Sequence, residues 1–369
     1  MTRLGIVGLP NAGKSTLFNA LVRGARAEVA AYPFCTIEPN VGVVEVPDEG
    51  VRILAEREGA ARAVPAVIEF VDIAGLVRNA SRGEGLGNRF LAHIREMDAL
   101  VMVLRCFEDE SVSHVEGTVD PLRDLDILEL ELIAKDLETV ERRWSRVEKP
   151  ARSGDRDARR ELEHLSLLRE ILERPEPLRR HRTGLPADLV AYAERTLFLL
   201  TLKPVLWVAN IGEGDLPRGE NNPLLRSLSR RAAGEGVPLV TLCAELEAQL
   251  AELPPEEARE MLSAYGLERP GLEILVEEGY RLLDLITFYT VNEKEARART
   301  VPRGTTAVEA AAGIHTDMAR GFIAAEVINL RDYLRVSGLA EARHRGLLRL
   351  EGRDYVLSNR DIVYIRFNI

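Results

Sequence analysis

Short runs of apolar residues recur in the first part of the chain and again after residue 203, and segments with helical spacing separate them. Runs of this length are typical of strands that are buried on both faces of a parallel sheet. The alternation of strand and helix therefore predicts a doubly wound α/β fold. The expected strands are residues 4–7, 41–46, 66–71, 99–106, 204–210 and 238–245.

Residues 121–203 have a different pattern. Apolar residues recur at steps of three and four from Ile127 to Val147, which predicts a long amphipathic helix. After a break over Lys149 to Asp157, helical spacing returns around Leu162 to Leu172 and over Ala187 to Leu202. Roughly 80 residues of charged helix exceed what a crossover needs, so we expect a protruding helical coiled-coil arm. A solvated two-helix surface layer is the alternative.

The last residues predict a small α+β unit. Leu285 to Val291 and Tyr355 to Phe367 have the composition of strands, while Ala307 to Ala312 and Thr316 to Leu330 have helical spacing. We therefore expect three domains, of which the first is discontinuous. They comprise residues 1–120 with 204–283, residues 121–203, and residues 284–369.

The stretch from Gly8 to Ser15 follows the first apolar run and has the spacing G-x-x-x-x-G-K-S. Glycines let backbone amides approach a polyphosphate, and the following helix presents its positive N-terminus. Lys14 adds a cation, and the hydroxyl of Ser15 can bind a bridging Mg²⁺. The pattern predicts a nucleotide-binding loop; an ordinary glycine turn is the alternative. The expected nucleotide contacts here are Asn11, Ala12, Gly13, Lys14, Ser15 and Thr16.

Two further segments are typical of a nucleotide-dependent switch. Asp72 follows a buried apolar run and begins the pattern Asp72-x-x-Gly75, while Thr36 lies in a proline-punctuated loop. Ligands collect at the carboxyl ends of parallel strands, so we expect Asp72 to hold Mg²⁺ through water, together with Ser15 and Thr36. The Gly75 amide would contact the γ-phosphate. A small-molecule kinase, which has an acceptor-binding lid instead, is the alternative.

Composition limits the partners and the compartment. The formal net charge of -10 argues against indiscriminate nucleic-acid binding, although a local basic face remains open. The three cysteines, Cys35, Cys106 and Cys243, lack metal-ligand spacing, and no apolar stretch approaches 18 residues. We therefore expect a reduced cytoplasmic protein with no secretory signal, no membrane partner and no DNA sequence specificity.

Taken together, these segments resemble the translation-factor class of P-loop GTPases and, more narrowly, its Obg-like branch. Four strings are similar to the ribosome-binding YchF subfamily, and the resemblance spans the whole chain. They are Tyr-Pro-Phe-Cys-Thr-Ile-Glu-Pro-Asn (32–40), Asp-Ile-Ala-Gly-Leu-Val (72–77), Gly-Glu-Gly-Leu-Gly-Asn (83–88) and His-Val-Glu-Gly-Thr-Val-Asp-Pro (114–121). Residues 284–291 and 313–322 look like that subfamily's β-grasp TGS domain.

Base recognition departs from the guanine-specific pattern Asn-Lys-x-Asp. The corresponding residues are Asn210, Ile211, Gly212 and Glu213, so both the Lys and the Asp are absent. The resembled subfamily hydrolyses ATP, and we expect ATP/ADP to be favoured while GTP/GDP binding stays open. A strand-end turn without a role in binding is the alternative. The resemblance adds Cys243, Ala244 and Glu245 to the expected nucleotide contacts.

The group that positions the attacking water is not the usual one. Ras-like enzymes have a Gln directly after Asp-x-x-Gly, whereas this chain has Leu76. The resemblance assigns a hydrolytic role to His114; an exposed loop histidine is the alternative. Asn11 corresponds to a K⁺ ligand of related cation-activated enzymes, so a K⁺ requirement is open. The residues expected to act on the phosphates are His114, Lys14, Thr36 and Gly75.

The sequence thus predicts a Mg²⁺-dependent triphosphatase that favours ATP over GTP and acts as a nucleotide-controlled switch. The resemblance implies a monomer that binds the large ribosomal subunit and regulates translation. The arginine-rich stretches Arg142-Arg143 and Arg179 to Arg182 could grip ribosomal RNA or only solvate helix ends. A GTP/GDP-binding nucleic-acid module, in which hydrolysis is incidental, is the alternative.

Overall fold

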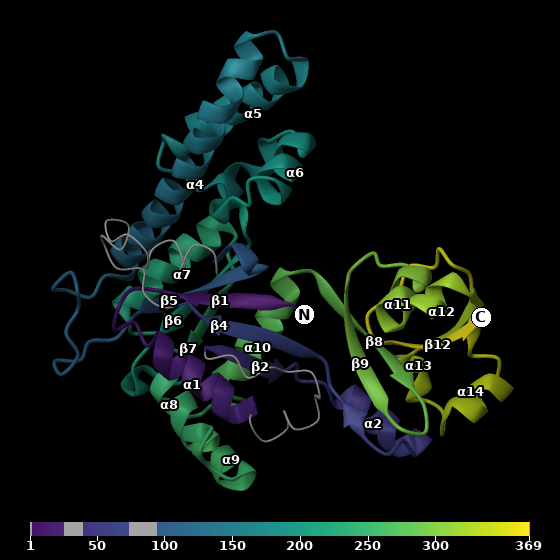
Figure 1. The fold of residues 1–369 in the computed structure, drawn as a ribbon. Coiled ribbons are helices and arrows are strands. Elements are labelled where there is room, and N and C mark those ends of the chain that lie inside the picture. Colours follow the sequence, from purple (N-terminus) through teal and green to yellow (C-terminus); the bar gives the residue numbers. More distant parts are fainter. Residues whose placement is uncertain (1, 26–39, 74–93, 369) are drawn as a thin grey trace.

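The computed structural model describes residues 2–25, 40–73 and 94–368. Figure 1 shows a central sheet with a long helical arm on one side and a second, smaller sheet unit on another. Within the described residues, no helix is long and apolar enough to cross a membrane.

The central sheet has six strands in the order β2-β4-β1-β5-β6-β7. All its pairings are parallel except that of β2 with β4, which is antiparallel. This arrangement confirms the predicted doubly wound α/β fold. The strands are β1 (Arg3–Val7), β2 (Val41–Glu45), β4 (Val67–Asp72), β5 (Ala99–Arg105), β6 (Val205–Asn210) and β7 (Leu239–Leu242).

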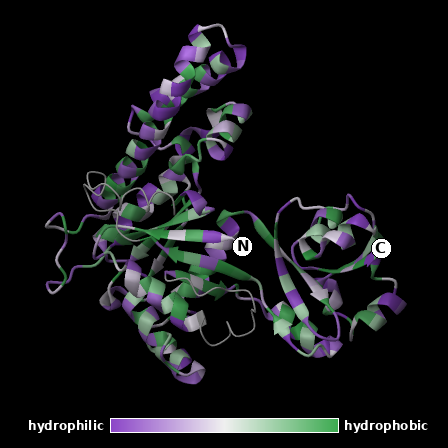
Figure 2. Cartoon of the chain, in the orientation of Figure 1, coloured by the Kyte–Doolittle hydropathy of each residue, from purple (hydrophilic) through white to green (hydrophobic). Residues whose placement is uncertain are grey.

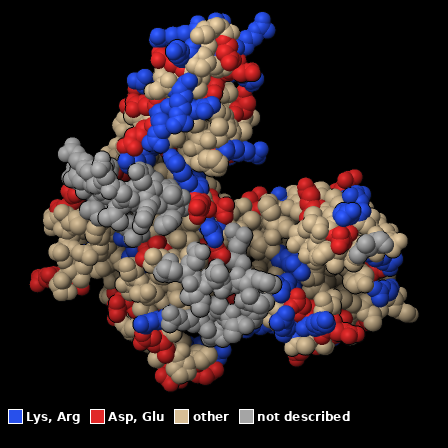
Figure 3. Space-filling view, viewed as in Figure 1, with Lys and Arg blue, Asp and Glu red and all other residues tan. Residues whose placement is uncertain are grey.

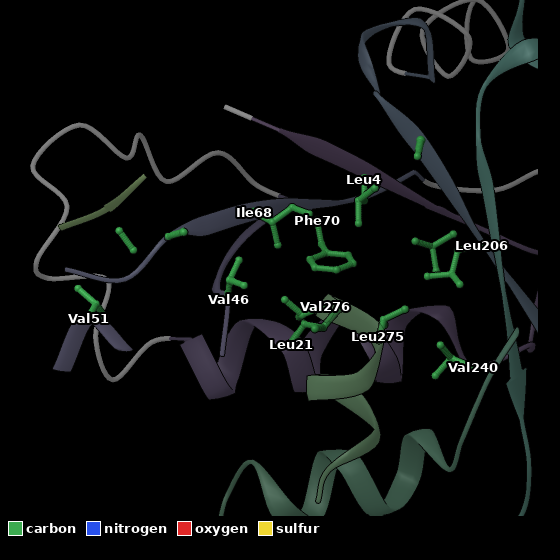
Figure 4. Close-up of a cluster of buried hydrophobic side chains, with 14 of the residues drawn as sticks. Leu4, Leu21, Val46, Val51, Ile68, Phe70, Leu206, Val240, Leu275 and Val276 are labelled. Carbon is green, nitrogen blue, oxygen red and sulfur yellow. The ribbon is translucent and has the colours of Figure 1, made fainter. Parts of the chain in front are cut away.

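Helices cover both faces of this sheet because its inner strands are apolar on both sides. Every residue of β5 is buried, and alternate residues join two different hydrophobic clusters. One cluster includes α1 (Lys14–Ala25) and α10 (Gly271–Leu282), and the other includes α4 (Pro121–Arg152) and α7 (Pro223–Glu235). In Figure 4, Leu21 of α1 and Val276 of α10 face Ile68 and Phe70 of the sheet. The short helices α8 (Ala244–Leu250) and α9 (Pro255–Ala264) follow β7.

The arm is formed by α4, α5 (Arg156–Leu172), the 3-10 helix Leu178–Gly184 and α6 (Ala187–Arg195). Asp120 and Asp155 cap α4 and α5, each accepting hydrogen bonds from two backbone amides. The break between them covers only residues 153–155, shorter than predicted, because the Asp155 cap restarts the helix at once. The third predicted helix ends at Arg195 rather than Leu202. Figure 2 shows hydrophilic and apolar residues alternating along the arm helices, as expected for helices that bury one face.

The second sheet has the order β11-β10-β12-β8-β9-β3. The predicted strand over Leu285 to Val291 is confirmed as β8, but the predicted helix over Thr316 to Leu330 is wrong beyond Arg320. Residues 322–329 form β10 because they pair with β12 along their length, which outweighs the helical propensity of Ala and Glu. The strands are β8 (Leu285–Val291), β9 (Ala296–Pro302), β10 (Phe322–Asn329), β11 (Arg349–Glu351) and β12 (Asp361–Phe367); α11 (Ala307–Ile314), α12 (Thr316–Arg320), α13 (Leu330–Tyr333) and α14 (Leu339–His344) accompany them.

A segment between β2 and β4 connects the two sheets. Its helix α2 (Glu49–Glu58) packs on β8 and β9, and its strand β3 (Ala63–Val64) pairs with β9. The hydroxyl of Tyr333 donates a hydrogen bond to Glu58 at 2.7 Å. Part of the region predicted to belong to the first domain therefore completes the second sheet, and the domain boundaries themselves remain a prediction.

Candidate nucleotide-binding site

The loop between β1 and α1 has the backbone that a phosphate-binding loop requires. Asn11 and Gly13 adopt the left-handed conformation, with φ of 62° and 94°. A Cβ atom at Gly8 would lie 2.5 Å from the carbonyl oxygen of Val103, so the turn leaves no room for a side chain there. Within the loop Ala12 is buried, while Ser15 and Thr16, in the first turn of α1, are exposed and half-buried. The residues predicted from the motif thus lie together at the carboxyl end of β1.

Lys14 and Asp72 lie on the same side of this loop. Asp72 is the last residue of β4 and is paired with Ile6 of β1, so the sheet register brings it to the loop, as predicted. The Lys14 ammonium donates a hydrogen bond to the carbonyl oxygen of Leu9 at 2.8 Å. Burial lowers the pKa of Lys14 and raises the pKa of Asp72, and the charge of each partly offsets the shift of the other.

The oxygen atoms here fit a Mg²⁺ ion. The Oδ1 atom of Asp72 is buried and has no hydrogen-bond partner among the described residues, which is costly unless a ligand satisfies it. Ser15 offers a second oxygen near the start of α1. No cluster of three or more His, Cys, Asp or Glu side chains suited to a metal occurs in the described ranges. A Mg²⁺ held by one or two protein oxygens, phosphate and water needs no such cluster.

Asn210, the last residue of β6, connects the phosphate loop to the start of α8. Its side-chain nitrogen donates to the carbonyl oxygen of Ala12 at 3.0 Å, and its side-chain oxygen accepts from the amide of Ala244 at 3.0 Å. Ile211 is buried and its amide donates to Leu242. Cys243 and Ala244 are buried at the start of α8, whereas Glu245 is exposed in its first turn. Motif residues far apart in the sequence therefore meet at one edge of the sheet.

Glu213 is held by two side chains that the sequence did not identify. Gln249 donates to one carboxylate oxygen at 3.1 Å, and the hydroxyl of Tyr265 donates to the other at 3.0 Å. The hydrogen bond to Glu213 raises the pKa of Tyr265. Gln249 lies on α8 and Tyr265 at the end of α9, and no spacing in the sequence marks either as a partner of Glu213.

The side chain of His114 is buried rather than exposed, with 3% of it accessible. Its Nε2 atom lies 2.8 Å from Oδ2 of Asp124, and its Nδ1 atom lies 3.1 Å from the amide of Glu116. The preceding residue, Ser113, accepts a hydrogen bond from the side chain of Asn11 at 3.0 Å. The backbone of the histidine loop therefore contacts the phosphate loop, while the imidazole ring bonds to α4.

The loop before His114 is organised by Arg105, another residue that the sequence did not reveal. Its guanidinium is buried and donates to the carbonyl oxygens of Phe107 and Val112 at 3.1 and 3.0 Å. Asn11 and Arg105 thus hold the same loop from two sides.

Two predicted site residues, Thr36 and Gly75, lie outside the described residues, as do Cys35 and Leu76.

Comparison with known proteins identifies similarity over the whole chain. A family model described as a 50S ribosome-binding GTPase matches residues 3–138, and a model of the YchF GTPase C-terminal domain, described as a protein of unknown function, matches residues 285–368. The chain is 46% identical over 366 residues to the ribosome-binding ATPase YchF of Bacillus subtilis, covering 99% of both chains. It is 47% identical to the protein of that name from Escherichia coli O157:H7, covering 100% of this chain and 99% of the relative.

Solved structures agree with these similarities. The YchF GTPase of Schizosaccharomyces pombe superimposes with a TM-score of 0.86 and 33% identity, covering 99% of this chain and 97% of that protein. A GTP binding protein from Pyrococcus horikoshii, 22% identical with a TM-score of 0.61 and full coverage of both chains, shares the fold.

Proposed function

The chain belongs to the YchF family of P-loop proteins, and on that basis we propose that it is a Mg²⁺-dependent nucleoside triphosphatase that switches ribosome binding with its nucleotide state. One observation carries the proposal: Lys14 and Asp72 are close enough to influence each other's charge beside the phosphate loop, and Oδ1 of Asp72 has no hydrogen-bond partner in the described part of the chain. The relatives from Bacillus subtilis and Escherichia coli carry the name ribosome-binding ATPase.

The phosphate end of the site suits a polyphosphate and a hard cation. The loop amides and the N-terminus of α1 would bind the phosphate oxygens, and Lys14 would neutralise part of their charge. Ser15 and Asp72 would hold Mg²⁺ together with Thr36, and Gly75 would contact the γ-phosphate. When bound, Mg²⁺ would offset the negative charge of the phosphates.

The base end of the site supports a preference for ATP over GTP. Glu213 offers only acceptors, so it suits the 6-amino group of adenine, and Ile211 occupies the place of the Lys that packs along guanine. Gln249 and Tyr265 fix the direction of the Glu213 carboxylate. Guanine also has donors on its edge, so we propose a preference and not a strict exclusion.

Hydrolysis would use His114 to orient the attacking water, because Leu76 has no hydrogen-bonding side chain. A group that is buried and bonded to Asp124 is poorly placed for this role, so the unstimulated rate should be low and a partner should raise it. Asn11 remains a proposed K⁺ ligand, although its side chain donates to Ser113 here.

We propose that the arm contacts ribosomal RNA on the large subunit. We also propose that the protein is a cytoplasmic monomer. Figure 3 shows Lys and Arg side chains along the arm, interspersed with acidic ones. Arg143 pairs with Glu161 at 2.5 Å, and Arg180 pairs with Glu129 and Glu235 at 2.8 and 2.9 Å. In the described part of the arm, Arg142 is exposed and forms no ion pair, so it is the better candidate for a phosphate contact.

The test is a titration of ATP, GTP and ADP against the purified full-length chain, with K⁺ and Na⁺ compared, followed by hydrolysis assays with and without ribosomes. We expect tighter binding of ATP than of GTP and slow turnover that ribosomes accelerate. His114→Ala should retain nucleotide binding and lose the accelerated turnover, whereas the exposed His344→Ala should behave as the parent.

Three outcomes would contradict parts of this proposal. If turnover is fast without ribosomes and does not change when they are added, the proposal that a partner stimulates hydrolysis is wrong. If His114→Ala stops hydrolysis while ribosome association and release proceed normally, the protein is a binding module in which hydrolysis is incidental. Transfer of phosphate to an acceptor other than water would make it a kinase.

A further inference from the structure

Both ring nitrogens of His114 are already engaged. The amide of Glu116 points at Nδ1 from 3.1 Å, and the guanidinium of Arg123 approaches the same atom at 3.5 Å. Two donors on one nitrogen require that nitrogen to be the unprotonated acceptor. The ring proton is therefore on Nε2, which donates to Asp124 at 2.8 Å. In this arrangement His114 has no free atom with which to orient a water molecule.

The ring of His114 bonds to α4, although the neighbouring backbone contacts the phosphate loop. Asn11 of the phosphate loop binds the carbonyl oxygen of Ser113, one residue before His114. The chain then turns sharply, with the amide of Gly117 donating to the carbonyl of His114 at 3.0 Å and Gly117 at a φ of 81°. This turn is the segment whose change would move the ring relative to the phosphate loop.

The carboxylate that holds the ring belongs to the arm. Asp124 is in the first turn of α4 and is buried, with 2% of its side chain accessible. The whole of α4 has 32 residues, and at about 1.5 Å per residue it is about 48 Å long. In Figure 1 the same helix runs from the central sheet to the end of the arm. One continuous helix therefore connects the Asp124 carboxylate with the end of the arm.

We propose that Asp124 is a positioning residue that holds His114 in a withdrawn position, and that movement of α4 on ribosome binding releases it. The proposal rests on the proposed function, because it assumes that His114 acts in hydrolysis. It accounts for slow unstimulated turnover by a specific contact: the water-positioning group is present but is bonded to the arm. It also gives the buried Asp124–His114 pair a role besides stabilising the start of α4.

The test is a double-mutant cycle in the full-length protein, using Asp124→Asn, His114→Ala and the combination, assayed with and without ribosomes. Asparagine keeps the shape of the side chain and weakens the charge-assisted hydrogen bond. We expect Asp124→Asn to raise ribosome-free kcat roughly tenfold, with little change in KM, and to reduce the stimulation by ribosomes correspondingly. In the His114→Ala background the same change should have no effect. Asp126→Asn, an exposed position on the same helix, is the matched control.

The outcomes separate this proposal from the one on which it rests. If His114→Ala leaves hydrolysis unchanged, the hydrolytic role of His114 is wrong. If His114→Ala abolishes hydrolysis and Asp124→Asn lowers or leaves the ribosome-free kcat, Asp124 does not restrain the ring, and our proposal is wrong. A measurement on the unaltered protein is independent of folding defects in the variants. Its histidine ¹⁵N spectrum should show a proton on Nε2 of His114, and an unprotonated Nε2 would overturn the proposal, because that atom could not donate to Asp124.

Discussion

The side-chain nitrogen of Asn210 packs against Gly13 so closely that a Cβ atom at position 13 would lie 2.2 Å from it. The same nitrogen donates to the carbonyl of Ala12, and the side-chain oxygen accepts from the amide of Ala244. One buried side chain therefore fixes the phosphate loop against the start of α8, where base recognition is expected. The glycine before Lys14 is required twice: by its left-handed backbone and by the space that Asn210 occupies.

Gly13→Ala should therefore disrupt nucleotide binding. The added methyl group must displace Asn210 and adopt a strained backbone, which together should lower the free energy of unfolding by about 2 kcal/mol. Nucleotide affinity should fall at least tenfold, by roughly 1.4 kcal/mol or more. Urea denaturation and a fluorescent-nucleotide titration measure the two effects. The matched control is Gly24→Ala in α1, the helix that follows Gly13, where nothing lies within 4 Å of the added atom, so stability and affinity should be unchanged or slightly higher.

Tyr265→Phe should reduce the preference for ATP. Removing the hydroxyl leaves one oxygen of Glu213 without its partner, so the carboxylate is held by Gln249 alone. One hydrogen bond contributes about 1 kcal/mol, so the ratio of GTP to ATP dissociation constants should change roughly fivefold. Tyr280→Phe is the control, because its hydroxyl bonds to Thr287 and Thr300, and this change should affect stability without altering the ratio. If the ratio of the GTP and ATP dissociation constants is unchanged in Tyr265→Phe, Glu213 does not select the base.

Asp72→Asn should separate stability from cation binding. Burial raises the pKa of Asp72 despite the nearby Lys14 charge, so the ionised carboxylate is disfavoured in the folded protein without a cation. A neutral amide should therefore raise the stability of the nucleotide-free protein at neutral pH. ATP affinity should fall in Mg²⁺ but not in EDTA, and Ser15→Ala should show the same difference between the two buffers. Equal loss in both buffers would mean that Asp72 acts on the nucleotide without Mg²⁺.

Much of the central sheet and of the phosphate site could be predicted because the signals are local. Buried strands of a parallel sheet are continuous apolar runs, and the loop from Gly8 to Ser15 is a fixed spacing followed by a helix. The position of Asp72 followed from the rule that ligands meet at the carboxyl ends of the strands. Each of these inferences needs only a short window of sequence.

The remainder depends on contacts between distant residues. β10 has Ala and Glu in a helical pattern, and its pairing with β11 and β12 makes it a strand. β3 is two residues long and pairs with β9, more than two hundred residues later in the chain, so no local pattern marks it. Asp124 and Tyr265 were missed for the same reason: each is defined by the buried or half-buried group that it contacts, and not by a motif.

We expect some arginines of the arm to stabilise the fold and others to bind the ribosome. Arg179 is nearly buried and pairs with Glu129, so Arg179→Ala leaves a buried carboxylate poorly compensated and should cost about 3 kcal/mol of stability. Arg142 and Arg146 lie one turn apart and are exposed, and Arg142→Glu with Arg146→Glu should leave the unfolding free energy nearly unchanged. The double change should weaken ribosome binding and reduce its salt dependence by a slope of roughly 1–2. If this variant binds ribosomes as tightly as the parent does at both low and moderate salt, this face makes no phosphate contact.

Glu247 should make the stability of the protein pH-dependent. It is 3% exposed and accepts hydrogen bonds from the amides of Gly271 and Leu272 at the start of α10. Burial, with a smaller contribution from the neighbouring Glu273 charge, raises the pKa of Glu247 from 4.5 to about 7. Between these two values the folded protein binds more protons than the unfolded chain, so the free energy of unfolding falls as pH rises from 4.5 to 7.

The contribution of Glu247 is present below its unfolded pKa and is lost as pH rises through the folded one, at most about 3 kcal/mol in total. Since other groups also titrate in this range, the informative quantity is the difference between the parent and Glu247→Gln. Urea denaturation from pH 5 to 7.5 should show the parent losing stability relative to this variant as pH rises. Glu257→Gln, an exposed position on α9, should give a curve parallel to that of the parent. Parallel curves for Glu247→Gln as well would show that the carboxyl titrates alike in the folded and unfolded chains, because only a pKa difference between the two states produces a slope.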